Sequence, residues 1–491
     1  MIHFYQNKRR WWAQLFFLII AYLLSRFNNL DRELASEEGF FLIPGRNFFE
    51  HRGYFARFGE FLNTTDHVNP FHKPPLASLF LGVFSFLSHD GIAGARLVPF
   101  LSGLFVCLLP FCVTSSWQPS VIVLVAPFFY AASSHMQTDP TVGLVGYSLV
   151  LIYWVSIFQG RRNIFPLLLG ASFLWLGKIE IAIIAGAASV ATILLIDKKT
   201  RKHALKDVAV CNFFGLVLFT MCSWLLGLTA GFPFRKSVFE VFGTIFRISA
   251  GLKFSFGTLL ELLGIIRDQC GISLFFITLI PIVVGSIFFS SRYNSNARKL
   301  QLSMVLFSFV PLVVYLKGGY VGDGFPRYFL VVFPSLFLAA GFALSNMDSK
   351  LRWATTAVIM TLAVALLLPL TLRLWKQPGN VTVQRYQYGL AQAVATLIER
   401  TKSGDRVFGV ERAIWYARDR KWTIVEGYEP YPEFHEAALK VAPLAAGGIF
   451  LKGQVADSRF FPITGQIVDI LRQRNFVLYD VGDYLVFARP K

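Results

Sequence analysis

Charged residues are scarce in this chain. Only 15% of its 491 residues are Asp, Glu, Lys or Arg, whereas a soluble domain usually carries about a quarter. Hydrophobic residues make up 55% of the chain, and Phe alone occurs 51 times. A surface in contact with water could not hold so many aromatic side chains. The composition therefore excludes a soluble globular protein and favours a membrane protein.

Cysteine is also rare, and the usual nucleotide-binding pattern is missing. The five cysteines are odd in number, and four of them lie inside apolar stretches. They are expected to be small core residues rather than a disulfide framework or a metal site. The glycines in segment 318–324 lack the Lys-Ser/Thr pair and the strand–turn–helix context of a phosphate loop. An enzyme that holds a nucleotide through such a loop is therefore not expected.

Basic residues give the chain a formal net charge of +18. They stand in short clusters between apolar stretches, which is typical of cytoplasmic loops and not of a nucleic-acid-binding surface. Lys8-Arg9-Arg10 precedes the apolar stretch 11–27, which has no small-residue cleavage site. The sequence therefore predicts a cytoplasmic N-terminus and a retained first helix rather than a cleaved signal peptide.

Apolar runs of spanning length predict an α-helical polytopic membrane protein with about eleven transmembrane helices. The run Leu76–Leu87 is shorter than the roughly 20 residues that a span needs. We expect it to be an interfacial or re-entrant helix of the first loop, opposite the cytoplasm (the far side). With that choice every strong basic cluster between spans falls inside. The spans are 11–28, 92–114, 119–134, 141–159, 163–177, 179–196, 208–228, 271–290, 302–316, 328–345 and 353–372.

The last part of the chain, 376–491, has a different composition. It is charged, and it contains strand-like runs at 406–410, 448–451 and 476–479, with a Val-Gly-Asp turn at 481–483 that predicts a terminal hairpin. Amphipathic stretches near 386–401 and 464–474 predict helices. We expect two domains: residues 1–375 in the membrane, and residues 376–491 as a small α/β domain on the far side.

Ionisable residues gather on the far side in this topology. Such residues near or within spans cost several kcal/mol unless they are paired or line a wet cavity, so they indicate a functional site. Carboxylates beside cations suit transfer from a lipid-phosphate donor. A carboxylate removes the acceptor proton, and Lys and Arg hold the phosphate that leaves. A transporter of an anionic substrate would also place cations near the membrane.

Six short motifs resemble those of the C-type glycosyltransferases. Within them the chain is most similar to protein O-mannosyltransferases and lipid A aminoarabinose transferases. The order and rough spacing of the motifs agree over residues 1–345. The motifs are Glu37-Glu38-Gly39-Phe40-Phe41-Leu42 (with Arg46), His72-Lys73-Pro74-Pro75-Leu76, Ala95-Arg96-Leu97-Val98-Pro99, Thr138-Asp139-Pro140, Gly177-Lys178 and Arg327-Tyr328.

The resemblance implies roles for these residues. The catalytic candidates are Glu37, Glu38 and Asp139, with Glu37 first and Glu38 its rival as the base. Glu37 stands where the family has Asp. The residues implied to bind the donor phosphate are Lys73, Arg96, Lys178, Arg327 and Tyr328. No cofactor is required on this reading; His72 stands at a position associated with a metal and could hold a divalent ion, although an ordinary hydrogen-bonding role is favoured.

The resulting prediction is an inverting glycosyltransferase of the inner (plasma) membrane. It would move a hexosyl or pentosyl group from a polyprenyl-phosphate donor to lipid A, lipopolysaccharide or another cell-envelope acceptor at the periplasmic face. The implied partners are that donor, a lipid or glycolipid acceptor and the membrane, and no nucleic acid. The alternatives are an enzyme resembling protein O-mannosyltransferases and a transporter or flippase of an envelope precursor.

Overall fold

The computed structural model divides the chain into two compact units. The first comprises Met1–Arg32 and Phe71–Val383, and the second Glu33–Pro70 and Gln384–Lys491. We call them the helical unit and the mixed unit. The residues that the structure describes are 8–30, 38–54, 74–88, 91–133, 136, 139–239, 241–242, 271–288, 295–317, 330–376, 389–410, 413–417, 420–424, 438–456 and 462–490.

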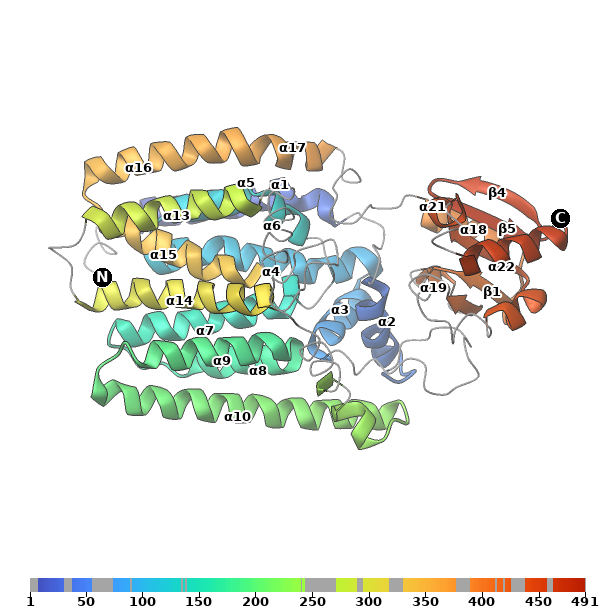
Figure 1. The fold of residues 1–491 in the computed structure, drawn as a ribbon, viewed down its shortest axis with the longest axis horizontal. Helices are drawn as coiled ribbons and strands as arrows, with labels where there is room; N and C mark the ends of the chain where they lie inside the picture. Colours follow the sequence, from blue (N-terminus) through green and yellow to red (C-terminus); the bar gives the residue numbers. More distant parts are fainter. Residues whose placement is uncertain are drawn as a thin grey trace. The chain divides into compact units, whose positions relative to one another are not determined.

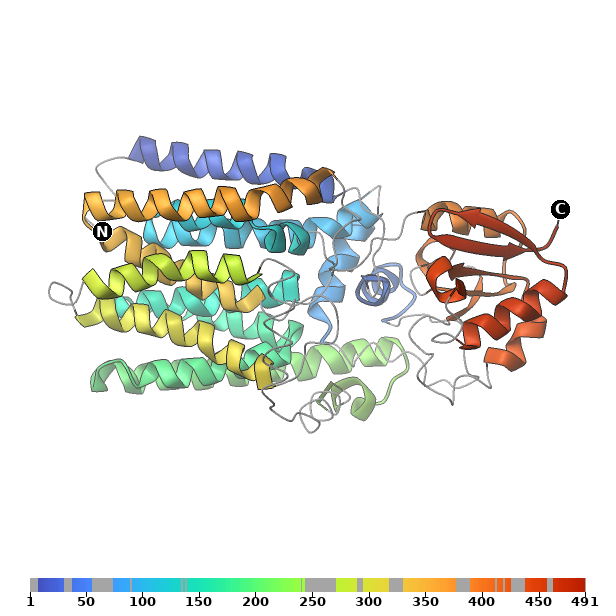
Figure 2. The same ribbon diagram turned by 45° about the horizontal axis from the view of Figure 1, so that its top comes forward.

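The helical unit is a bundle whose long helices run alternately in opposite directions (Figures 1 and 2). Its elements are α1 (Lys8–Arg26), η2 (Phe27–Asn29), α3 (Leu76–Leu87), α4 (Gly91–Thr114), α5 (Gln118–Val125), α6 (Pro127–Ala132), η4 (Asp139–Gly143), α7 (Leu144–Phe158), α8 (Phe165–Gly177), α9 (Ile179–Ile193), α10 (Lys198–Thr229), η5 (Arg235–Phe239), α13 (Gly271–Phe288), α14 (Ser295–Lys317), α15 (Val332–Asn346), α16 (Ser349–Leu362), η7 (Ala363–Leu367) and α17 (Leu368–Lys376).

The predicted spans coincide with these helices, which confirms an α-helical polytopic membrane protein. Among the described residues, five helices are long and apolar enough to cross a membrane: Gly91–Thr114, Pro140–Phe158, Lys198–Thr229, Ala297–Val314 and Ser349–Trp375. The other predicted spans correspond to α1, α5 with α6, and the shorter apolar helices α8, α9, α13 and α15. The apolar part of Pro140–Phe158 is 72% buried, against 28% for Lys198–Thr229. The first therefore lies inside the bundle and the second presents an apolar surface outward.

The predicted third span, 119–134, corresponds to two helices in the structure rather than one. Ala126 separates α5 from α6 with an extended backbone, φ −80° and ψ 121°, and Pro127 follows it. A residue before proline avoids the helical region, and proline cannot donate to the preceding turn. The last carbonyl groups of α5 therefore need partners from elsewhere in the fold.

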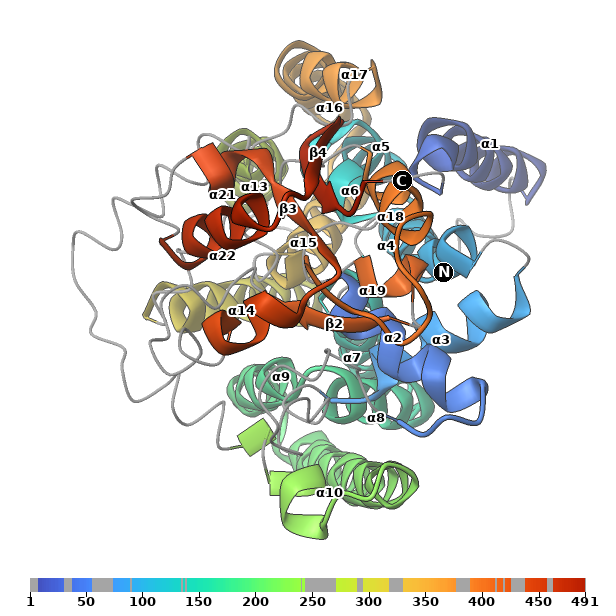
Figure 3. The same cartoon turned by 90° about the vertical axis from the view of Figure 1, so that its right-hand side faces the viewer.

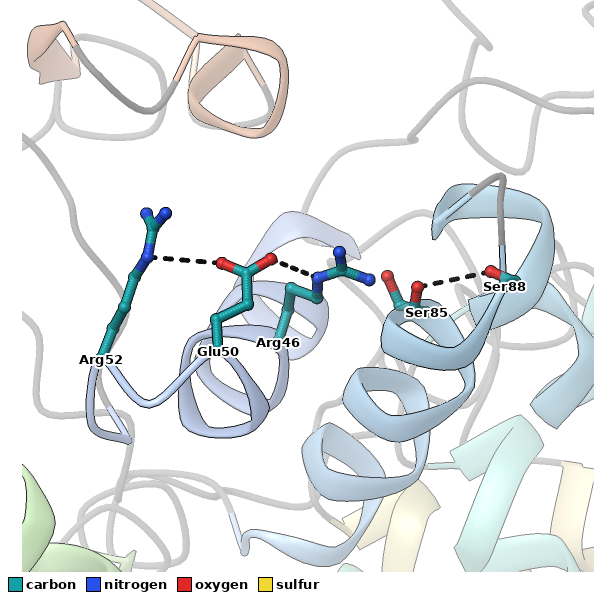
Figure 4. Close-up of polar contacts among 5 residues, drawn as sticks. All are labelled: Arg46, Glu50, Arg52, Ser85 and Ser88. Carbon is teal, nitrogen blue, oxygen red and sulfur yellow. Dashed lines mark hydrogen bonds and ion pairs between the residues drawn. The ribbon is translucent and has the colours of Figure 1, made fainter.

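The short run Leu76–Leu87 forms a helix of its own, α3, as its length predicted. It ends where the Ser88 amide donates to the Phe84 carbonyl at 3.2 Å and the Ser88 hydroxyl to the Ser85 carbonyl at 3.3 Å (Figure 4). A Cβ added at Gly94 of α4 would overlap Ser88 Oγ. Glycine is thus needed for α3 to fold back closely on α4. The position of α3 in the membrane stays a prediction.

The basic turns between the long helices gather at one end of the bundle, which we call the basic end. There Arg162 pairs with the buried Asp207 and Arg352 Nη2 donates to the carbonyls of Ser345 and Met347, both at 2.9 Å. Asp197 begins α10 and accepts from the Thr200 amide at 3.1 Å and hydroxyl at 3.0 Å, and these hydrogen bonds lower the pKa of the Asp197 carboxyl. The C-terminal end of α1, the start of η4 and the α8–α9 turn lie at the opposite end, the site end.

The mixed unit is built on one sheet of five strands in the order β2-β1-β3-β5-β4. β1 is parallel to β2 and β3, whereas β5 is antiparallel to β3 and β4. The predicted terminal hairpin is confirmed as β4–β5, with Gly482 in the turn at φ 56°. The elements are α2 (Glu38–Phe49), α18 (Leu390–Ile398), β1 (Arg406–Gly409), α19 (Ala413–Tyr416), β2 (Lys421–Ile424), η8 (Ala442–Leu444), β3 (Gly447–Leu451), α21 (Lys452–Ala456), α22 (Pro462–Gln473), β4 (Val477–Val481) and β5 (Tyr484–Ala488).

Alternate residues of the central strands fill two cores, one on each face of this sheet. Val407 and Ile449 pack with α18 and α19, whereas Phe408 and Phe450 pack with α22. Figure 3 shows α22 on one side of β3 and α18 on the other. This alternation follows from the two-residue period of a strand that is covered on both faces. The predicted small α/β unit is therefore present.

Candidate active site

Four of the nine predicted site residues fall within the described part of the chain. Arg96, Asp139 and Lys178 belong to the helical unit, and Glu38 belongs to the mixed unit. For Asp139 only the backbone position is described. The others lie outside the described residues: Glu37, His72, Lys73, Arg327 and Tyr328.

The three residues of the helical unit lie on neighbouring elements at the site end. Arg96 is in the second turn of α4, Asp139 begins η4, and Lys178 lies between α8 and α9. Both α4 and α8 pack against η4. At Gly177 a Cβ would overlap Cγ2 of Val142, so the α8–α9 turn rests directly on η4. η4 is a π-helical turn, a form that is rare and recurs at functional sites.

Arg96 is fully buried, with 0% of its surface exposed. Moving a guanidinium from water into a protein interior costs several kcal/mol before any pairing is counted. A helix of this composition could place an apolar side chain there at no such cost. A buried cation at the site end is the kind of residue that marks a functional site, which supports the functional interpretation of the Ala-Arg-Leu motif.

Lys178 forms the junction of two helices. Its backbone is non-helical, φ −157° and ψ 87°, and its amide closes α8 by donating to the Leu174 carbonyl. Its carbonyl opens α9 by accepting from the amides of Ile181 and Ala182, both at 3.1 Å. The first turn of a helix carries partial positive charge, and Lys178 adds a full charge there. This junction is suited to an anion such as phosphate.

The Lys178 ammonium has an acidic neighbour at the limit of ion-pair distance. Its Nζ lies 3.9 Å from Oε1 of Glu180, with side chains 5% and 24% exposed. None of the described residues donates a hydrogen bond to Oε2 of Glu180, although that atom is buried. Glu180 is thus an acidic neighbour of the Lys178 ammonium rather than a close ion-pair partner.

The close contact at Gly177 leads to a prediction about the packing of the site. Gly177→Ala would ordinarily stabilise a helix by about 1 kcal/mol, but here the added Cβ overlaps Val142. We expect a net loss of about 1–3 kcal/mol from overpacking, measured as a lower midpoint of thermal unfolding in detergent. Gly186→Ala in α9 is the control, because its Cβ would meet no atom within 4 Å. If both variants were stabilised, the proposed contact would be wrong.

Arg26, near the end of α1, was not identified from the sequence. It is fully buried, and its Nη2 donates to the carbonyls of Val123 at 3.2 Å and Leu124 at 2.9 Å. Its guanidinium carbon lies 4.7 Å from the ring centroid of Tyr130. These carbonyls lie at the end of α5, where Pro127 lacks the N–H that would donate to the Val123 carbonyl and the extended Ala126 interrupts the helix. The only signal in the sequence was an arginine inside a predicted span.

Arg26 is therefore expected to hold the break between α5 and α6 in place. Arg26→Ala removes two charge-assisted hydrogen bonds to buried carbonyls and should cost about 3 kcal/mol or more. The expected result is a clearly lower unfolding midpoint, whereas Arg9→Ala, at the exposed start of the same helix, should leave it unchanged. Equal midpoints for the two variants would contradict this role.

In the mixed unit, α2 begins with Glu38, whose surface is 0% exposed. Arg46 in this helix donates from Nε to Glu50, and Arg52 Nε lies 3.4 Å from the other oxygen of Glu50 (Figure 4). Glu50 is thereby held between two guanidinium groups. Among the described residues no group of three or more His, Cys, Asp and Glu side chains could hold a metal ion. Because His72 lies outside those residues, the metal site stays a prediction.

The comparisons with known proteins concern the fold. No family model matches the sequence, and no curated protein matches it. The structure is similar to the crystal structure of ArnT from Cupriavidus metallidurans bound to undecaprenyl phosphate, with a TM-score of 0.63 and 14% identity over 98% of this chain and 99% of that chain. The apo state of ArnT gives a TM-score of 0.58 at the same identity and coverage. The chain therefore shares the fold of ArnT over nearly its whole length.

Proposed function

We propose that this protein, which has the fold of ArnT over nearly its whole length, is an inverting glycosyltransferase that uses a polyprenyl-phosphate sugar. The observation that carries the proposal is the junction at Lys178. A buried ammonium meets the start of α9 there, and the turn rests on η4, which begins at the motif residue Asp139. The crystal structure of ArnT contains undecaprenyl phosphate, a lipid with the anionic head group that such a junction suits.

The reaction that we propose is a single displacement. A carboxylate of the Glu37–Glu38 segment takes the proton from the acceptor hydroxyl, and the acceptor oxygen forms a bond to the anomeric carbon of the sugar. The bond from that carbon to the phosphate oxygen breaks, and the polyprenyl phosphate leaves with its electron pair. Lys178 and Arg96 stabilise the charge that develops on this phosphate. No metal ion is required for this sequence of bond changes.

The acceptor that we propose is lipid A, lipopolysaccharide or another glycolipid of the cell envelope. The motifs support it through their similarity to lipid A aminoarabinose transferases. The far-side location rests on the positive-inside rule, because the basic turns occupy the end of the bundle opposite Arg96 and Lys178. The active face would then be periplasmic and the protein would reside in the inner membrane.

A direct assay separates this proposal from its alternatives. Purified protein in lipid nanodiscs would receive a polyprenyl-phosphate sugar together with lipid A or with a hydroxyl-rich peptide, and products would be identified by mass spectrometry. Transfer to lipid A in the presence of a chelator is the expected result. Transfer to the peptide alone would indicate a protein-modifying enzyme. Movement of the donor across the bilayer without any transfer would contradict a transferase.

A further inference from the structure

Helix α2 is buried on almost every side. Glu38, Phe41, Leu42, Ile43 and Asn47 are each at most 4% exposed. Along the chain α2 lies between α1 and α3, which both belong to the helical unit.

The core to which Ile43 belongs shows of which unit α2 is a part. Ile43 belongs to the core of the mixed unit, together with Leu390 and Val394 of α18 and Trp422 of β2. α2 also packs against α19. These residues are more than 340 positions away in the sequence by the numbering, so the association is tertiary and owes nothing to chain proximity.

The helix against which α2 packs is itself tied to the sheet. The Ala413 amide donates to the Val410 carbonyl at 3.0 Å, just after β1. The indole of Trp422, on β2, donates to the Ala417 carbonyl at 2.6 Å just after α19. Both ends of α19 are thus fixed to the two parallel strands. A helix that packs on α19 therefore packs against an element that is fixed to the sheet.

We infer that Ile43 is a positioning residue: it anchors α2 in the mixed unit, so that the C-terminal domain holds Glu38, the first residue of that helix. Because α2 packs against α19, the effect reaches Glu38, five residues before Ile43 on the same helix. The C-terminal domain would then be part of the catalytic apparatus rather than only an appended contact surface. The catalytic half of this inference rests on the proposed glycosyltransferase function, whereas the anchoring half does not.

Hydrogen exchange tests the anchoring without any need for activity. In the full-length protein in nanodiscs, amide exchange would be followed by mass spectrometry in peptides from α2. Val394→Ala and Ile43→Ala each remove buried atoms from the core of the mixed unit and should raise the α2 exchange rate about tenfold or more. Ile277→Ala is the matched control, because Ile277 is equally buried in the bundle core. It should leave α2 exchange unchanged.

Two results would overturn the anchoring. One is an α2 exchange rate that rises in Ile277→Ala and stays at the wild-type value in Val394→Ala. The other is α2 protection that persists in Ile43→Ala. A milder variant, Ile43→Val, should show an intermediate rate, which keeps the test informative if Ile43→Ala folds poorly.

A kinetic measurement tests the positioning role. Ile43→Ala should lower kcat at least tenfold with an unchanged KM for the donor, and Ile43→Val should restore most of kcat. A loss of kcat in proportion to the loss of folded protein would mean that Ile43 is merely structural. If exchange behaves as expected while the wild-type protein shows no sugar transfer, the proposed function fails and the anchoring stands.

Discussion

Replacing Glu37 and Glu38 together by Gln should abolish detectable sugar transfer. Gln keeps the size and hydrogen-bonding capacity of Glu but cannot take the proton of the acceptor hydroxyl. Loss of a general base usually lowers turnover by about 10²–10⁴-fold. The structure places Glu38 at the first position of α2 with no exposed surface.

The single variants decide between the two carboxylates. If one single Gln variant loses as much turnover as the double variant, the residue replaced in it is the base. The other single variant should keep its turnover within about tenfold of the wild-type value. Glu50→Gln is the control from the same segment. Glu50 is held by Arg46 and Arg52 near the surface, and such a pair contributes about 1 kcal/mol or less. Turnover retained in the double Gln variant would show that neither residue is the base.

Lys178→Met should lower kcat by about 10²–10³-fold. Met fills a similar volume without charge, so the packing of the α8–α9 turn is largely kept while the stabilisation of the leaving phosphate is lost. Lys178→Arg should recover part of the rate, because a guanidinium binds phosphate with a different geometry. Steady-state kinetics with a polyprenyl-phosphate sugar would provide the measurement. Circular dichroism would establish that the variants are folded.

Glu180 provides the control for a purely structural role of Lys178. If Lys178 only neutralises Glu180, which lies 3.9 Å away, the double variant Lys178→Met/Glu180→Gln removes both charges and should restore turnover. If Lys178 holds the leaving phosphate, the double variant stays as slow as Lys178→Met. Wild-type turnover in the double variant would therefore contradict the phosphate-binding role. The inverse test, Glu180→Gln alone, should change turnover by less than about tenfold.

Much of the architecture was predictable from local sequence. In a bilayer each spanning helix must satisfy its own backbone hydrogen bonds, so its length and apolar character are encoded in one continuous run. The run Leu76–Leu87 is too short to span a bilayer, so its length alone distinguished it from the spanning helices. It forms α3. The terminal hairpin followed from its Val-Gly-Asp turn. The basic clusters also fall together at one end of the bundle, as their alternation between apolar runs requires.

The features that the sequence left undecided depend on contacts between distant residues. The break at Ala126 needs both Pro127 and a donor from α1, and only the fold shows that Arg26 supplies it. Gly177 looked like one member of a short motif, but its lack of a side chain is required by Val142 of η4. Neither requirement leaves a periodic signal in the sequence.

The sequence by itself determined the membrane class, the spans and their alternation, and the α/β character of the terminal domain, because each of these is set by runs of neighbouring residues. Only the tertiary structure decided that α4, η4 and the α8–α9 turn pack together and that α2 belongs to the mixed unit. Ile43 is one apolar residue in a stretch that the sequence assigns to a loop, and the residues with which it shares a core, such as Leu390 and Trp422, follow more than 340 residues later. Side-chain packing between segments so far apart is selected by the shape of the whole core, which no local pattern encodes.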